Sequence, residues 1–194
     1  MVKIGFIVEG DCEKIFIESD NFKNWANMQG IEICSPVVNA KGGGNLLPQN
    51  IKPMVELLQY ANAQHIVILT DLEREPDEIL VRNRIGSEYT NHVFISVKAF
   101  EAWFLADSDA MKKWLKVDSF YEDEPEKTED LPWDRLKALA AALDKKGTGK
   151  NKPNFAKFMM KHYEFSIERA AKHPNCASAK KFHDGLITLG KQNA

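Results

Sequence analysis

Residues 2–13 have the sequence VKIGFIVEGDCE, and this stretch decides the fold. Its first part is short, mostly apolar and rich in β-branched residues, which predicts a buried strand. Glu9-Gly10-Asp11 ends the apolar run. Apolar side chains then recur at helical spacing as far as residue 28. We therefore expect a buried strand, a loop and a helix over residues 12–28.

The same alternation of strand and helix continues along the chain. We expect further strands over residues 31–38, 65–70 and 92–98, and helices over residues 47–62 and 76–88. Pro36 indicates that the second strand lies at an edge, because proline cannot donate a ladder hydrogen bond. Alternating strands and helices are typical of βαβ units. The sequence thus predicts an α/β fold with a mostly parallel, four-stranded, Rossmann-like sheet over residues 1–107.

The pattern changes after Phe100, where helical signals follow one another without strands. They cover residues 101–115, 133–145, 153–172 and 177–190. Residues 118–132 (DSFYEDEPEKTEDLP) are acidic and contain proline, which predicts an exposed loop. We expect residues 108–194 to form a helical extension packed on the first part, within one compact domain.

Composition narrows the class of protein. The chain has 194 residues, of which 44% are hydrophobic, and a formal net charge of −2. This length suits one domain. The net charge lacks the basic excess of a typical DNA-binding domain. It still permits a nuclease, since a carboxylate cluster offsets basic groups and metal ions neutralise it locally.

Cysteine usage and hydropathy point to the cytoplasm. The three cysteines, Cys12, Cys34 and Cys176, show no CxxC or Cys/His spacing, which argues against structural zinc and disulfides. The N-terminal apolar run is too short for a signal peptide. No stretch approaches the roughly 18 apolar residues that span a bilayer. We expect a cytoplasmic protein without membrane association, and the oligomeric state stays open.

Carboxylates follow two of the predicted strands. Glu9 ends the first strand, with Glu13 four residues later, and Asp71 ends the third, with Glu73 two residues later. Ligands of open parallel sheets bind outside the carboxyl ends of the strands. Oxygen ligands suit Mg²⁺ or Mn²⁺, and a bound cation relieves the repulsion among crowded carboxylates. The pattern predicts a divalent-metal site of one or two ions.

A structural interpretation of these acids stands beside the functional one. Acids at strand ends are common, and Asp11 suits a helix N-cap. Any one of these residues alone favours the structural interpretation. The paired arrangement, an acid after each of two buried strands with a second acid nearby, favours a site.

Three stretches resemble motifs of TOPRIM domains, the fold shared by type II topoisomerases, bacterial primases and OLD-family nucleases. FIVEGDCE (6–13) is similar to the first motif and VILTDLE (67–73) to the second, Asp-x-Asp. VKAFEAWFLAD (97–107) is similar to the signature of small stand-alone TOPRIM-like proteins. RloB-like relatives of these occur in phage-defence loci. The segments NKPNFAKFMMKHY and SAKKFHDGL match more loosely.

The resemblance implies roles for individual residues. Glu9 would be a metal ligand or acid–base group, and Asp71 the first metal-binding acid of the second motif. Glu73 stands where the motif has its second Asp, one methylene longer, which leaves one or two metals open. Glu13 matches a second acid of OLD-like nucleases. Glu101 belongs to the small family's signature and is expected at the site; Asp107 lies six residues on, off the same helical face.

Basic residues are weaker candidates. KGGGN (41–45) has glycines that let N–H groups approach phosphate, but an ordinary flexible loop is the simpler interpretation. Lys41 is a candidate catalytic cation near a scissile phosphate, and Lys98 is a similar one. Lysines interleaved with aromatics over residues 145–163 suit nucleic acid, although a helix with an apolar core face and a solvated basic face explains them as well.

Three functions remain open at this point. The first is a Mg²⁺- or Mn²⁺-dependent nuclease or related phosphoryl-transfer enzyme that acts on nucleic acid, in phage defence or DNA processing. The second is a non-catalytic TOPRIM-like sensor or effector that works with a separate ATPase partner, since this chain has no ATPase motif. The third, a flavodoxin-like nucleotide-binding domain, lacks a Gly-rich phosphate motif after the first strand.

Overall fold

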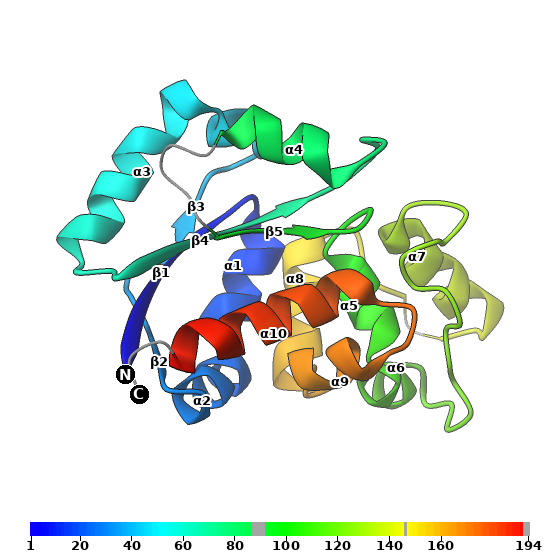
Figure 1. Cartoon of the computed structure of the whole chain (residues 1–194). Helices are drawn as coiled ribbons and strands as arrows, with labels where there is room; N and C mark the ends of the chain where they lie inside the picture. The colour runs from blue at the N-terminus through cyan, green and yellow to red at the C-terminus, as the bar shows by residue number, and fades with distance from the viewer. Residues whose placement is uncertain (87–91, 146, 192–194) are drawn as a thin grey trace.

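A computed structural model describes residues 1–86, 92–145 and 147–191, and within them a parallel sheet has helices on both faces (Figure 1). The strands run in the order β2-β1-β4-β5, and β3 also pairs with β1, all in parallel. Their bounds are β1 Val2–Val8, β2 Ile31–Ile33, β3 Val38–Asn39, β4 His65–Asp71 and β5 His92–Ser96. The α/β fold and the parallel sheet are therefore confirmed.

The predicted number of four strands is wrong. The expected strand over residues 31–38 is two short strands, so the sheet has five. β2 pairs with the start of β1 and β3 with its end. Pro36 lies between them and has no N–H to give to the ladder, which accounts for the break at this edge.

The helices cover the sheet in two layers (Figure 1). On one face lie α3 (Pro48–Tyr60) and α4 (Glu78–Ile85), whose apolar residues form a cluster with Ile7, Ile68 and Val93. The other face carries a larger cluster from the remaining helices. These are α1 (Asp11–Glu18), α2 (Asp20–Met28), α5 (Glu101–Ala106), α6 (Ser108–Leu115), α7 (Pro132–Ala142), α8 (Lys152–Lys161), α9 (Ile167–Lys172) and α10 (Ala177–Lys191).

Three predicted helices are each broken in two. The helix expected over residues 12–28 is α1 and α2, because the Ser19 hydroxyl caps α2 by accepting from the Phe22 N–H. The segment over residues 101–115 is α5 and α6, and the Asp107 carboxylate caps α6 through the Ala110 N–H. Residues 153–172 form α8 and α9. The breaks bring α1 and α5 to the sheet as short helices that begin at its carboxyl edge.

Aromatic rings from both predicted parts of the chain share one core. Phe16 of α1 lies 4.4 Å from Phe22 and 5.3 Å from Phe100, measured between ring centroids. The same ring lies 5.7 Å from Phe165 and 6.1 Å from Phe182. Residues beyond 107 thus complete the hydrophobic core that the sheet and α1 begin.

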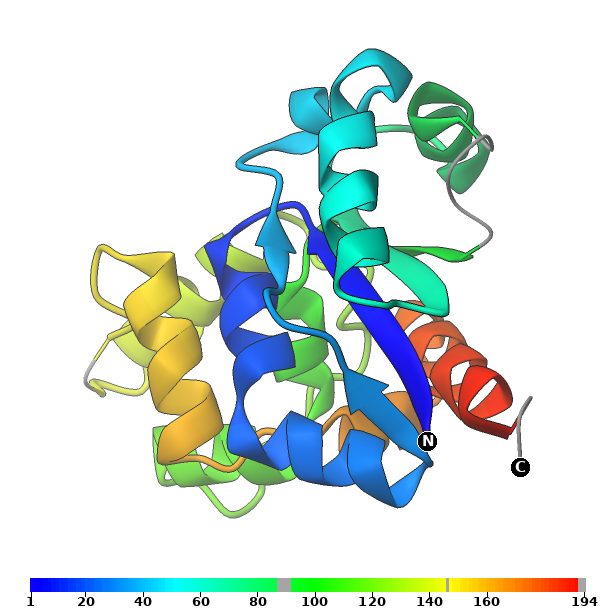
Figure 2. The same ribbon diagram turned by 90° about the vertical axis from the view of Figure 1, so that its left-hand side faces the viewer.

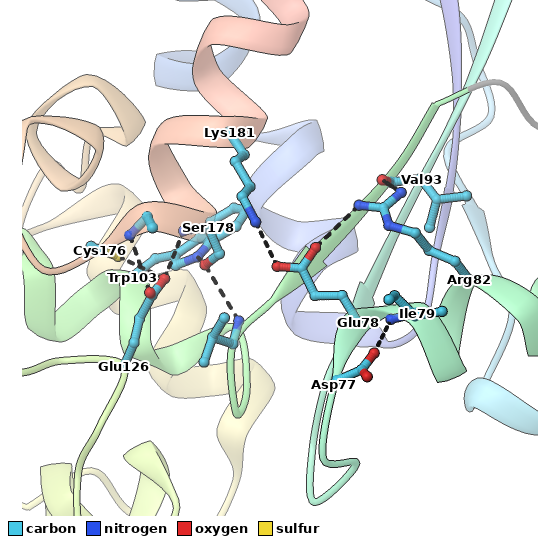
Figure 3. Close-up of polar contacts among 12 residues, drawn as sticks. Asp77, Glu78, Ile79, Arg82, Val93, Trp103, Glu126, Cys176, Ser178 and Lys181 are labelled. Atoms are coloured by element: carbon cyan, nitrogen blue, oxygen red, sulfur yellow. Dashed lines mark hydrogen bonds and ion pairs between the residues drawn. The ribbon is translucent and has the colours of Figure 1, made fainter.

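The acidic stretch over residues 118–131 has no helix or strand, but it is not simply exposed. Glu126 is buried, and its carboxylate accepts from the backbone N–H groups of Ala177 (3.1 Å) and Ser178 (2.8 Å) at the start of α10 (Figure 3). Four unsatisfied N–H groups and a partial positive charge make a helix N-terminus attractive to a carboxylate. The expectation of a wholly exposed loop was wrong at this residue.

Among the described residues, no helix combines the length and the apolar composition that crossing a bilayer requires.

Candidate metal and phosphate site

A cavity of about 420 Å³ opens where β1 and β4 end and α1 and α5 begin. It brings together four of the predicted carboxylates and two lysines: Glu9, Glu13, Asp71, Glu101, Lys41 and Lys152. The carboxyl ends of neighbouring parallel strands meet at one edge of the sheet, and β1 and β4 are hydrogen-bonded neighbours. Glu9 and Asp71 therefore lie at the same edge of the sheet, as their positions after the two strands predict.

Glu9 is held by three donors. Its Oε2 accepts from the Thr70 hydroxyl and from the Asp71 backbone N–H at 3.1 Å. Its Oε1 accepts from the Gly43 N–H at 3.2 Å. Hydrogen bonds to a charged carboxylate are stronger than neutral ones, so these donors fix the orientation of Glu9.

Asp71 is the carboxyl that burial affects most. Burial raises its pKa well above the ordinary value, and the nearby charges of Glu13, Glu101 and Glu9 raise it further, while a hydrogen bond from Ser96 opposes them. Oδ1 accepts from the Ser96 hydroxyl and, at 2.8 Å, from the Phe100 N–H. Oδ2 has no hydrogen-bond partner among the described residues, so it is the oxygen of Asp71 available to a ligand.

Glu13 and Glu101 reach the cavity from the first turns of α1 and α5. Burial raises the pKa of Glu13 to about 7, and the charges of Glu101 and Glu9 add to the effect. Glu101 is also buried, but its Oε1 lies 3.1 Å from the Lys152 ammonium. Among the described residues, the pair of Glu101 with Lys152 is the close ion pair of the site, so the raised pKa values of Glu13 and Asp71 reflect carboxyls without a cationic partner.

Lys152 is a site residue that the motifs did not reveal as one. It is the first residue of α8, which packs beside α1 (Figure 2). Burial alone would lower the pKa of Lys152, but the Glu101 carboxylate, with Asp71, holds it above its ordinary value. The lysine lies 51 residues after Glu101 in the sequence, so only the packing of the helical part brings it to the cavity.

Two glycines of the KGGGN segment donate hydrogen bonds to Glu9. The Gly43 N–H donates to its carboxylate, and the Gly42 N–H donates to its backbone carbonyl at 2.8 Å. A Cβ atom on residue 43 would lie 3.3 Å from Glu9 Oε1 and 3.3 Å from Arg84 Nη2. A side chain there would crowd both groups, and these two N–H groups orient Glu9 rather than project as a phosphate cradle. Lys41 is exposed at the cavity.

Some candidates lie elsewhere. Glu73 is exposed, adopts a positive φ of 51° and does not line the cavity, so its role as a ligand stays a prediction that its position does not support. The Lys98 ammonium donates to the Thr128 carbonyl in the acidic loop. Asp107 is buried in a bidentate pair with Arg169, at 2.7 and 2.9 Å, which gives it a structural role.

The carboxylate oxygens that line the cavity are ligands of the kind that a hard divalent cation prefers. Crowded carboxyls with raised pKa values and a free Asp71 oxygen are the environment that such a cation stabilises. Within residues 1–86, 92–145 and 147–191, however, no three His, Cys, Asp or Glu side chains converge as a metal-binding group. Mg²⁺ usually takes one or two carboxylates and completes its shell with water and phosphate, so the cavity suits that mode.

Comparison of the chain with protein-family models, with curated proteins and with solved structures found no match. The similarity to TOPRIM motifs therefore stays a prediction from the sequence, and function has to be argued from the cavity itself.

Proposed function

We propose that the protein is a Mg²⁺- or Mn²⁺-dependent nuclease, or a closely related phosphodiesterase, that acts on nucleic acid. The observation that carries this proposal is the cavity where Glu9, Glu13, Asp71 and Glu101 crowd together, with burial raising the pKa of Asp71 and Glu13. Four carboxylates in one small cavity repel one another, and perturbed pKa values of this kind cluster at functional sites.

The residues of the cavity have separate tasks in this proposal. Asp71 Oδ2 and one neighbouring carboxylate, that of Glu13, would hold the cation, with water and phosphate completing its shell, and the cation would supply positive charge beside the scissile phosphate. Glu9, fixed by three donors, accepts a proton from the attacking water. Lys152 and Lys41 supply positive charge from two distant parts of the chain, and Lys152 also balances Glu101.

The test is a cleavage assay on labelled DNA and RNA, single- and double-stranded, across a screen of divalent metals. We expect Mn²⁺- or Mg²⁺-dependent cleavage that Asp71→Asn and Glu9→Gln each reduce by at least about a hundredfold, the range for groups acting in the transition state. Glu73→Gln is the matched control, because this exposed carboxylate follows the same strand but does not line the cavity.

Calorimetry of Mn²⁺ binding tests whether the cavity binds metal, independently of whether the protein cleaves nucleic acid. We expect Asp71→Asn to weaken binding and Glu73→Gln to leave it unchanged. Cleavage that persists in both Asp71→Asn and Glu9→Gln would contradict the proposal. So would a folded wild-type protein that neither cuts any of the four substrates nor binds Mn²⁺.

A further inference from the structure

A second cavity, of about 230 Å³, lies on the other side of the start of α8. Its apolar walls are aromatic: Trp114, Phe155, Phe158 and Tyr163. Phe155 and Trp114 are buried core residues, 4.8 Å apart between ring centroids, whereas Phe158 is 49% exposed. The remaining lining comes from residues 147–151 and from Asn154, with no carboxylate among them. An exposed aromatic ring at the mouth of an aromatic cavity offers a flat surface for stacking.

The segment that forms this second cavity is basic. Residues 145–163 contain six lysines and no Asp or Glu, although the whole chain has a net charge of −2. Lys150 lines the cavity, and both it and Lys145 are exposed and form no ion pair among the described residues. Lys157 and Lys161 lie at a different cavity, beside Glu18, Asp20 and Glu164. Such a cluster is costly in an isolated surface and suits a polyanion.

The two cavities meet at the first turn of α8. Lys152 and Pro153 line the acidic cavity, whereas Asn151, Asn154 and Phe155 line the aromatic one. A strand that crosses this turn of α8 would run from one cavity to the other.

We infer that the aromatic cavity binds an unpaired base of a single-stranded nucleic acid, whose backbone continues past Lys150 and Lys152 at the start of α8 into the acidic cavity. This inference rests on the proposed function and names its substrate class. Stacking on aromatic side chains and a positively charged track are the features by which proteins hold single strands without reading sequence. A base within a duplex is already stacked and paired and would have to be extruded before it could stack here, so a single strand is favoured.

Fluorescence anisotropy with a labelled oligonucleotide of about 12 nucleotides tests the inference, a length within the range that one such site covers. The measurement is made in EDTA, so that no cleavage is possible, with single-stranded DNA, single-stranded RNA and the matching duplexes. We expect single strands to bind more tightly than duplexes. Phe158→Ala should weaken single-strand binding about tenfold, whereas Phe158→Trp, which keeps a stacking surface, should retain it.

Matched variants control for loss of bulk and of charge. Tyr60→Ala removes an aromatic ring that is 91% exposed on α3, on the opposite face of the sheet, and should leave affinity unchanged. Phe158→Leu keeps apolar bulk without a ring and should bind as weakly as Phe158→Ala. Lys150→Gln should lower the dependence of binding on salt by about one counterion, and Lys52→Gln on α3 should not.

The inference is overturned if Phe158→Ala and Phe158→Leu, shown to be folded by circular dichroism, bind single strands as the wild type does. It is also overturned if duplexes bind as tightly as single strands, or if no oligonucleotide binds. None of these results decides whether the acidic cavity cleaves phosphodiesters, because the Mn²⁺-dependent assay with Asp71→Asn measures that separately.

Discussion

Glu13 occupies a position in which its anion is disfavoured by both burial and charge. Because its pKa is raised to about 7, the folded protein holds this proton at pH values at which the unfolded chain has released it. Burial raises the pKa of Asp71 in the same direction. At neutral pH the cavity therefore carries less negative charge than its composition indicates.

We predict that Glu13→Gln flattens the pH dependence of stability in EDTA. Native Glu13 binds its proton more tightly than the unfolded state does, so wild-type stability falls as pH rises from about 4.5, and the full penalty is present above about pH 7. The penalty is on the order of 3 kcal/mol. Urea unfolding at about pH 5 and about pH 8 measures it.

The control for this variant is Glu18→Gln, an exposed change on the same helix. It should keep the wild-type pH slope. Asp71 still titrates in the Glu13→Gln protein, so the slope becomes smaller without reaching zero. Equal slopes in the wild type and in Glu13→Gln would show that Glu13 ionises freely in the folded protein.

At the level of single residues, the sequence predicted the acids that end strands and missed their partners. Glu9 and Asp71 were identifiable because strand ends in a parallel sheet converge. Thr70 and Ser96 had a usable signal, since each is a hydroxyl residue that ends an apolar strand, and both donate to these carboxylates. Lys152 had only a weak one, its place in the basic, aromatic-containing segment, because no local spacing relates it to Glu101.

Among the elements, α10 depends on a carboxylate from outside its own sequence. Glu126 accepts from two N–H groups at the start of the helix, and the Cys176 thiol also lies within 3.6 Å of Oε1 (Figure 3). Ser178, one of the donors, accepts in turn from the Trp103 indole at 2.7 Å. The acidic loop thus fixes the junction between α10 and α5.

We predict that Glu126→Gln destabilises the protein by about 1–2 kcal/mol. The amide keeps one acceptor, but its NH₂ group would face a backbone donor and leave a buried N–H unsatisfied, and the charge that favours the helix N-terminus is lost. Glu129→Gln, an exposed change in the same loop, should have almost no effect. Urea unfolding of the wild type and of both variants measures these changes. If Glu126→Gln were as stable as the wild type, water would replace the contacts of the Glu126 carboxylate.

Helix boundaries were less predictable than helix positions. The breaks at Ser19 and Asp107 follow from capping side chains, which are present in the sequence but compete with an apolar pattern that continues through them. Glu126 was not predictable, because an acidic, proline-containing stretch looks solvated unless the helix N-terminus it contacts is known. Its partner lies 51 residues away along the chain.

For the whole molecule, the alternation of strands and helices predicted the layers but not the order of the strands. β1 lies in the interior of the sheet because β2 and β3 return to one side of it and β4 to the other. No local pattern specifies these pairings. The packing of the aromatic core was also not predictable from local sequence, because the rings that surround Phe16 come from segments as distant along the chain as α10.

We predict that a fragment containing residues 1–107 does not fold alone, and that the full chain unfolds in one transition. Without Phe165 and Phe182, the Phe16 ring and its neighbours would lose their cover on the helical face of the sheet. Near-ultraviolet circular dichroism and the dispersion of amide proton resonances measure this. A fragment with native-like spectra would show that the two parts are independent domains.

The ion pair between Lys152 and Glu101 has a consequence for protein synthesis. The ribosome releases the strands that carry Glu9 and Asp71, and then Glu101, before it has made α8. A nascent chain of that length has the acids but neither the lysine that balances them nor the rings that complete their support. The cavity is therefore complete only late in translation, after α8 has left the ribosome and packed beside α1.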